Sequence, residues 1–389
     1  MFIVNKHSLL TFFLVIFFVA NLVQFGIYRG FLFEVSAFFA LLFFMMAAFP
    51  RMPRLPSGVY LFWVFSLLVF ISAALHFVLG GSIRGLLAYL FFLFSLILVL
   101  WYSDKLSCSD CNRLLFLFLI FSLSLILYSF INYFSLRRFS GVFDNPNGMG
   151  RFAGWTMLLC VTYIFFQPVS YRPKNLNFLV YLALFLSFVS LILSNSRLPL
   201  LSIVVSLSAI FSLLGLKVLL KGRFILSFAL KVSSMVALFF LVSSALWFFG
   251  FFDELVNKFV ETFARGDFTQ DRANRWSQAI PYFTWFGHGH DIYNRVDFGE
   301  VHSNYISQIL IFGWIPAVSM YLLLFYLFFL SLSGFWRSVN FFYIFSFAFF
   351  VFYFVYSLFE TGFAILPIYL AVFFLGLGKA HESKGILLR

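Results

Sequence analysis

His302 is the residue of this sequence whose position best suits proton transfer. It opens the stretch VHSNYISQILIFGWIP, residues 301–316, where a polar segment gives way to an apolar one. A histidine at a helix N-terminus meets the positive end of the helix dipole, which disfavours imidazolium and keeps the ring neutral. A neutral imidazole can act as a general base. The same position also suits a histidine that only caps a helix, so this stretch leaves both interpretations open.

Three arginines in two separate segments have the chemistry of an anion-binding site. Arg197 follows the turn SNS and begins an apolar segment, whereas Arg272 and Arg275 lie three residues apart on a predicted helix and share one face. A guanidinium presents a fixed fork of N–H donors that matches phosphate oxygens. The alternatives are that Arg197 extends to the membrane surface and that Arg272 and Arg275 occupy a solvated helix face.

The sequence predicts no metal and no cofactor. Cys108 and Cys111 form a CxxC pair, but a structural zinc site needs four ligands and no second pair exists. His288 and His290 flank a glycine in FGHGH, where no third ligand follows at metal-binding spacing.

Composition identifies the chain as a polytopic, all-α membrane protein. Of its 389 residues 63% are hydrophobic and 10% charged, with a mean hydropathy of +1.01. Apolar runs of about 20 residues cross a bilayer, and they must be helices because lipid offers no backbone hydrogen-bond partners. Twelve runs are expected to span: 8–27, 30–49, 58–80, 85–103, 114–134, 148–167, 176–194, 198–216, 224–250, 312–333, 339–359 and 362–378.

Charge predicts the orientation of these spans. An even number puts both termini on one side, and the short connections on that side, with Arg51, Lys105 and Lys174, are rich in basic residues, which makes it cytoplasmic. Carboxylates collect on the opposite face, including Asp144 and Glu360. Much of the formal charge of +12 therefore sets topology and does not indicate a nucleic-acid partner.

One hydrophilic segment, 251–301, interrupts the single membrane domain of residues 1–389, between the ninth and tenth spans. DELVNKFVETFAR at 253–265 has the pattern of an amphipathic helix on the membrane, and DRANRWSQAIPYF at 271–283 predicts a second short helix ended by Pro281. A third helix is expected to begin at His302. Its apolar face holds Ile306, Ile309 and Leu310, its opposite face holds Ser303, Asn304, Ser307 and Gln308, and Gly313 and Pro316 mark the start of the next span.

Four elements of the sequence resemble motifs of the bacterial O-antigen ligase and O-antigen polymerase superfamily. They are GVFDNPNGMG at 141–150, SNSRLPLL at 194–201, Arg272 with Trp276 followed by FGHGH at 286–290, and His302, Ser303, nine residues and Gly313. The family signature has Gly, Thr or Tyr where this chain has Pro316. The four elements occur in the family's order and on the same predicted face.

The resemblance implies a GT-C-like glycosyltransferase in the inner membrane of a Gram-negative bacterium. Such enzymes transfer a glycan from undecaprenyl pyrophosphate to a sugar hydroxyl at the periplasmic face. The resemblance assigns the donor pyrophosphate to Arg197 and Arg272, with Arg275 beside Arg272, and the acceptor hydroxyl to His302. Arg138 and Asn147, in a shorter outer loop at 136–148, are further candidates for substrate binding.

The acceptor distinguishes the two activities of this superfamily. A ligase uses lipid A-core as the acceptor, whereas a polymerase joins lipid-linked repeat units to one another. Many polymerases of this superfamily have two large arginine-rich outer loops. This chain has one large outer loop, so its sequence favours the ligase. A transporter of lipid-linked oligosaccharide is a third interpretation, but carriers place charged groups near the bilayer midplane, where these spans have almost none.

Overall fold

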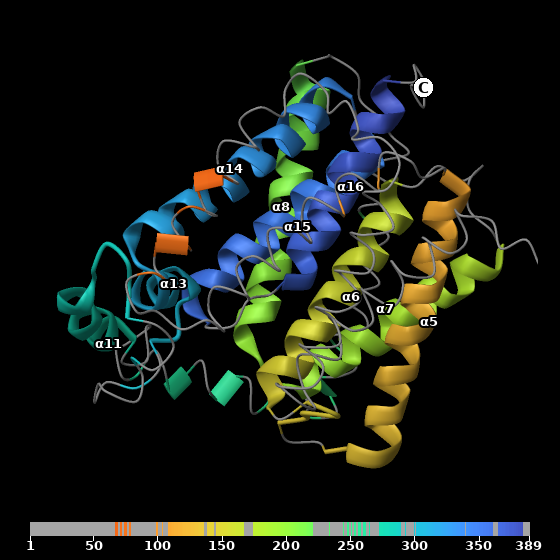
Figure 1. Ribbon diagram of the computed structural model, residues 1–389. Coiled ribbons are helices and arrows are strands. Elements are labelled where there is room, and N and C mark those ends of the chain that lie inside the picture. Colours follow the sequence, from red (N-terminus) through yellow and green to blue (C-terminus); the bar gives the residue numbers. More distant parts are fainter. Residues whose placement is uncertain are drawn as a thin grey trace, which may run out of the picture. The chain divides into compact units, whose positions relative to one another are not determined.

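The computed structural model describes residues 108–135, 138–143, 145–166, 174–220, 272–288, 301–338, 340–360 and 365–383, with isolated positions between them. The described residues are helical and contain no β-strand (Figure 1). They fall into two compact units. The α5–α8 unit holds α5 (Cys108–Tyr133), α6 (Pro146–Phe166), α7 (Lys174–Leu193) and α8 (Arg197–Leu220). The α11–α16 unit holds α11 (Arg272–Ala279), the 3-10 turn η3 (Ile280–Tyr282), α13 (Asn304–Phe312), α14 (Trp314–Arg337), α15 (Phe341–Phe359) and α16 (Ile365–Ser383).

Six helices in this part of the chain are long and apolar enough to cross a membrane. They are Asn112–Tyr133, Pro146–Phe166, Leu176–Leu193, Arg197–Lys217, Trp314–Arg337 and Phe341–Phe359. The predicted spans 114–134, 148–167, 176–194, 198–216, 312–333 and 339–359 are thereby confirmed as helices of membrane-spanning length. The run 362–378 corresponds to α16, whose apolar part, Ile368–Lys379, is shorter.

The remaining predicted spans, 8–27, 30–49, 58–80, 85–103 and 224–250, lie almost wholly outside the described residues, and so does the predicted helix 253–265. The chain is therefore an all-helical polytopic membrane protein in the part that the structure describes.

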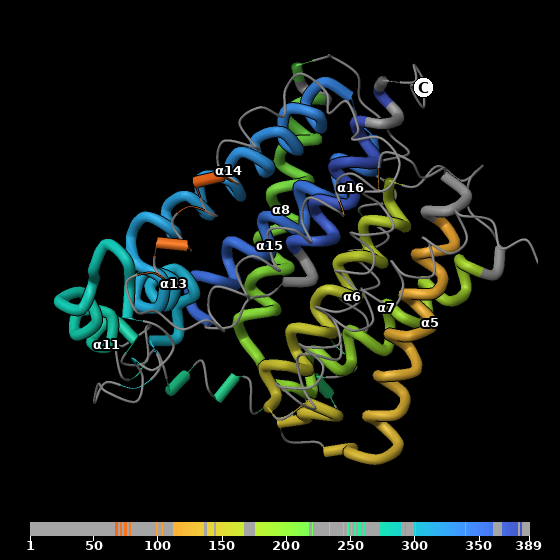
Figure 2. The backbone as a smooth tube through the Cα atoms, in the orientation of Figure 1, coloured from red at the N-terminus to blue at the C-terminus, as the bar shows by residue number. Residues whose placement is uncertain are grey.

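Helix α6 is the buried centre of the α5–α8 unit. It packs against α7 and α8 (Figure 2). Every residue from 148 to 163 is buried. The connection between α5 and α6 and the connection between α7 and α8 meet at one end of the unit. A hydrogen bond of 2.9 Å from the backbone N–H of Phe139 to the carbonyl oxygen of Leu193 joins these connections. This end of the unit therefore carries the loop and turn motifs noted in the sequence.

Aromatic rings form most of the core of the α11–α16 unit, where α15 packs against both α14 and α16. The rings of Phe345 on α15 and Phe374 on α16 lie 4.4 Å apart, and those of Phe328 on α14 and Phe347 lie 5.4 Å apart. Each stacked pair of this kind stabilises the fold by about 0.5–1.5 kcal/mol beyond the effect of burying its apolar area. The phenylalanines of α15 therefore serve as packing material.

Candidate functional site

His302 occupies a turn that precedes α13. The helix begins at Asn304, its N-cap is Ser303, and His302 comes one residue earlier with a φ angle of +46°. The sequence prediction that His302 begins the helix is therefore wrong by two residues. The reason is the left-handed backbone at His302, which turns the chain before the helix starts. The Nδ1 atom of His302 is buried.

Helix α11 is joined to the His302 turn and to the end of α15. The indole N–H of Trp276 donates a 2.7 Å hydrogen bond to the carbonyl oxygen of Val301, the residue before His302. The ring of Trp276 also stacks on Phe359, with centroids 6.1 Å apart. One turn earlier on α11, Nη2 of Arg272 lies 3.9 Å from Oε2 of Glu360. Arg272, Trp276 and the His302 turn therefore belong to one connected cluster.

The electrostatics of this cluster centre on Arg272. Burial lowers the pKa of its guanidinium, because removal from water disfavours the charged form, and the nearby charge of Arg275 adds to this lowering. Glu360 and, to a smaller extent, Tyr356 act in the opposite direction. The prediction that Arg272 and Arg275 are neighbours agrees with this interaction. Arg272 lies against the carboxylate of Glu360.

The polar face that the sequence predicts for α13 is buried in the structure. Asn304 donates to the hydroxyl oxygen of Tyr353 at 3.0 Å, and Gln308 donates to the side-chain oxygen of Asn304 at 3.3 Å. Tyr305 donates to the carbonyl oxygen of Phe354 at 3.2 Å, and burial raises the pKa of its hydroxyl. Asn304 thus finds its partner on α15, and Gln308 finds its partner in Asn304. Such partners are what permit polar groups to be buried. The network fixes α13 directly after the His302 turn.

Gly287 of FGHGH and Gly313 of the His302 signature lie against each other. The segment 284–288 lies along the junction of α13 and α14, where the His288 N–H donates to the Leu310 carbonyl at 2.9 Å and the Trp314 N–H donates to the Thr284 carbonyl at 3.0 Å. A Cβ on Gly287 would collide with the backbone at 311–313, and one on Gly313 would collide with the backbone at 285–287. Both glycines have positive φ, +72° and +91°. Only glycine allows this close approach of two backbones.

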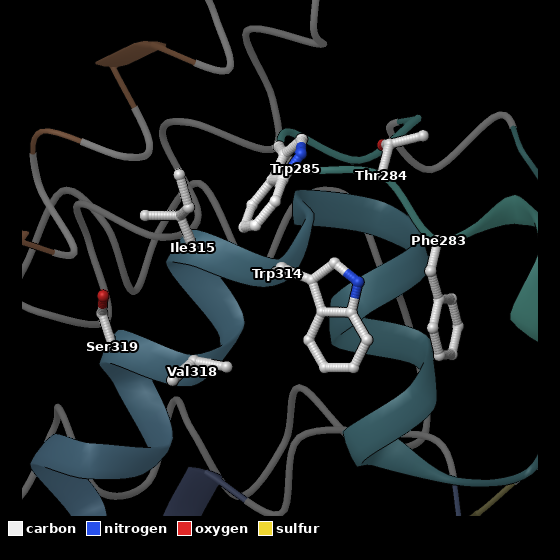
Figure 3. Close-up of a pocket in the computed structure, with 7 residues that line it drawn as sticks. All are labelled: Phe283, Thr284, Trp285, Trp314, Ile315, Val318 and Ser319. Carbon is white, nitrogen blue, oxygen red and sulfur yellow. The ribbon is translucent and has the colours of Figure 1, made fainter.

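A pocket of about 660 Å³ opens beside this junction. Figure 3 shows its lining at the start of α14 and in the segment after η3: Phe283, Thr284, Trp285, Trp314, Ile315, Val318 and Ser319. The lining is mostly apolar and aromatic, and the rings of Phe283 and Trp314 meet edge to face at 5.3 Å. Ligand pockets are commonly built in this way, with a few hydroxyl groups among apolar side chains.

In the α5–α8 unit, the turn 194–196 packs against the start of α6. The Ser196 hydroxyl donates to the side-chain oxygen of Asn147 at 3.0 Å. A Cβ on Gly150 would lie 2.6 Å from the Ser194 hydroxyl oxygen and 2.7 Å from Ser196 Cβ, so glycine permits the contact. Arg197 follows directly as the first residue of α8 and is partly exposed. The structure therefore brings together the motifs at 141–150 and 194–201.

Arg138 and Asn147, the candidate residues of the outer loop 136–148, are more exposed than Arg197. Arg138 is exposed and has a φ of +56°, beside the buried Phe139, and Asn147 is exposed despite its hydrogen bond. Arg137 and Asp144 lie outside the described residues.

Arg151 is a buried charge that the sequence analysis missed. It lies on α6 with 8% of its surface exposed, and its guanidinium carbon is 5.7 Å from the ring centroid of Trp155. The signal was present in the sequence, because an arginine inside an apolar span identifies a candidate functional residue. Among the described residues, no group of three or more His, Cys, Asp or Glu side chains could hold a metal ion.

These helices and polar clusters define an integral membrane protein with candidate anion-binding and proton-transfer residues near the ends of its spans. No known family model matches the chain, and no curated protein matches it. The relation to O-antigen ligases and polymerases stays a prediction from the motifs.

Proposed function

We propose that this protein is a lipopolysaccharide O-antigen ligase. It transfers a glycan from undecaprenyl pyrophosphate to a sugar hydroxyl of lipid A-core at the periplasmic face of a Gram-negative inner membrane. The proposal includes twelve spans, cytoplasmic termini and a GT-C-like fold. The observation that carries it is the connected cluster of Arg272, Trp276 and the His302 turn, in which Trp276 bonds to Val301. A cation and a histidine are thereby joined beside the ends of membrane-spanning helices.

Charge development on the leaving group explains the need for arginine. When the glycosyl–phosphate bond breaks, negative charge grows on the pyrophosphate, and fixed cationic donors stabilise it. Arg272 and Arg275 on α11 supply such donors without a metal ion, and Arg197 is proposed as a further donor on the strength of its motif. Loss of one preorganised donor typically lowers a rate by about 10²–10³.

His302 is proposed as the base that accepts the acceptor's proton. The acceptor hydroxyl oxygen attacks the anomeric carbon, its proton passes to the imidazole, and undecaprenyl pyrophosphate leaves with the electron pair of the broken bond. This single displacement inverts the anomeric centre. A positioned base contributes about 10²–10⁴ in rate.

The aromatic pocket beside α14 supports a reaction between lipid-linked substrates. Trp285 and Trp314 line it, and tryptophan is enriched where a membrane meets water. An apolar pocket at the start of a span suits a substrate whose reacting group is attached to a hydrocarbon chain.

A deletion strain tests the activity through a gel of its lipopolysaccharide. A ligase predicts core without O-antigen and polymer that accumulates on the undecaprenyl carrier. Core with a single repeat unit would instead identify the O-antigen polymerase, and a normal ladder would exclude both activities.

Purified variants test the residue roles. His302→Ala should lower transfer by about 10²–10⁴, while His288→Ala, whose ring contacts the Tyr282 carbonyl, should transfer near the wild-type rate. Full activity of His302→Ala would refute the base assignment. Arg197→Ala and Arg272→Ala should weaken donor binding as well as turnover, and unchanged binding would remove either arginine from the pyrophosphate site.

A further inference from the structure

We propose that Glu360 is a positioning residue of the donor site, and that its carboxylate holds the Arg272 guanidinium ready for the pyrophosphate. The inference rests on the proposed function, because it takes Arg272 as a ligand of the donor. Glu360 belongs to none of the four motifs; it follows α15, about 90 residues after Arg272 along the chain.

The geometry of the pair leaves Arg272 able to bind a second anion. A contact of 3.9 Å joins Nη2 of Arg272 to Oε2 of Glu360. A guanidinium has five N–H donors, so one contact with a carboxylate leaves others that can meet phosphate oxygens. The Arg272 and Glu360 side chains are 21% and 13% exposed. The pair is therefore shielded from water and still reachable from the surface.

A second contact, between Trp276 and Phe359, fixes α11 beside the Arg272–Glu360 pair. Arg272 and Trp276, one helical turn apart on α11, meet Glu360 and Phe359, which are consecutive at the end of α15. Two contacts between the same two elements fix the rotation of α11 as well as its distance from α15. The direction in which Arg272 points is therefore set before a donor arrives.

The energetics favour positioning over competition between Glu360 and the donor. Arg272 is partly buried, which disfavours its charge, and Glu360 opposes that effect. Without Glu360, the guanidinium would turn towards water and would have to be ordered and desolvated again when the donor binds. Ordering a long side chain weakens binding. A carboxylate that holds the guanidinium in place removes this loss, and the unused donors still face the ligand.

Binding of undecaprenyl pyrophosphate without glycan to the purified full-length protein tests the inference. Glu360→Ala should raise the dissociation constant by about tenfold, because the long Arg272 side chain must then be ordered when the donor binds. Glu360→Gln loses the charge but keeps the size and an oxygen dipole near Arg272, so it should recover part of the loss. In a transfer assay, the KM for the donor should rise while kcat changes little, because the lost interaction serves ground state and transition state alike.

Glu382→Ala is the matched control. Its carboxylate oxygen lies 3.6 Å from Nη1 of Arg337, at the ends of α14 and α16, and it should leave donor binding unchanged. Wild-type binding of the donor by Glu360→Ala, or tighter binding, would overturn the positioning role and leave the proposed function intact. If the wild-type protein itself does not bind undecaprenyl pyrophosphate, the proposed function fails and this inference fails with it.

Discussion

The two units hold their candidate residues by different kinds of contact. In the α11–α16 unit, backbone hydrogen bonds across Gly287 and Gly313 are combined with an indole bond and an ion pair from α11. In the α5–α8 unit, one backbone hydrogen bond, from Phe139 to Leu193, joins the two connections, and the turn 194–196 meets α6 through a serine hydroxyl on Asn147 and a glycine against two serines. The first arrangement fixes backbone groups, and the second brings small side chains together.

This difference indicates how each unit should respond to substitution. Backbone atoms cannot move without displacing the elements on both sides, whereas a serine hydroxyl can rotate away at small cost. The α11–α16 unit should therefore lose more from one added methyl group. Substitutions at matched positions measure this difference.

Gly313→Ala should have the largest effect. The added Cβ meets the Trp285 carbonyl and the backbone of residues 286–287, and the φ of +91° is unfavourable for alanine. Strained backbone and overpacking together should cost about 3 kcal/mol of unfolding free energy. The measurement is the thermal unfolding midpoint of the purified protein. Gly299→Ala is the control, because φ there is +66° but nothing lies within 4 Å of an added Cβ. Equal losses at both positions would disprove the backbone contact.

Gly150→Ala should have a smaller effect, which tests the contrast between the units. Its Cβ would approach the Ser194 hydroxyl oxygen, which can rotate away, and Ser196 Cβ, which moves only with its backbone. Gly150 does not have the positive φ of Gly313, so overpacking alone should cost about 1–2 kcal/mol in the same unfolding measurement. Gly215 on α8 has nothing within 4 Å of an added Cβ, so Gly215→Ala should be neutral or stabilising by up to about 1 kcal/mol. A Gly150→Ala loss larger than that of Gly313→Ala would reverse the comparison.

Trp276→Phe removes the indole donor and keeps an aromatic ring for Phe359. Loss of the bond to the Val301 carbonyl should destabilise the protein by about 1 kcal/mol. The freed His302 turn should lower transfer by about tenfold, which corresponds to roughly 1.4 kcal/mol of barrier. Trp336→Phe, on a side chain that is 42% exposed, serves as the control and should transfer normally. Full transfer by Trp276→Phe would separate α11 from the function of His302.

Ser196→Ala should have the smallest effect. It removes the hydrogen bond to Asn147, whose side chain is exposed, so the loss should be about 0.5–1 kcal/mol. The double variant with Asn147→Ala should lose no more than Ser196→Ala alone, because both changes remove one interaction. Additive losses in unfolding measurements would show that the two side chains act independently.

Hydropathy predicted the long helices well, because a bilayer imposes one length on every span. The predicted run 339–359 and α15, Phe341–Phe359, end at the same residue, and α8 begins one residue before the run 198–216. The contact between Gly287 and Gly313 was not predictable in the same way. The sequence analysis noted FGHGH and Gly313 separately. Only the tertiary structure shows that the backbones at these two glycines are in contact.

Polar residues explain most of what the sequence analysis missed. Asn304 is buried because Tyr353 supplies a partner from a helix some 50 residues away, and no local pattern reveals that partner. Gln308 donates in turn to Asn304. Glu360 was noted only as an outer-face carboxylate, yet it pairs with Arg272. Local sequence identified the arginine and the histidine, whereas the residues that hold them come from elsewhere in the chain.

The left-handed turn at His302 implies that folding alone does not favour histidine there. Among the described residues, positive φ at non-glycine positions occurs at Arg138, Asn195 and His302, each beside or within a motif. A side chain in this conformation costs about 1–2 kcal/mol relative to glycine. Glycine at position 302 would relieve this strain but would also remove the imidazole. The strain falls on the residue that we propose as the base, and backbone strain of this kind clusters at active sites.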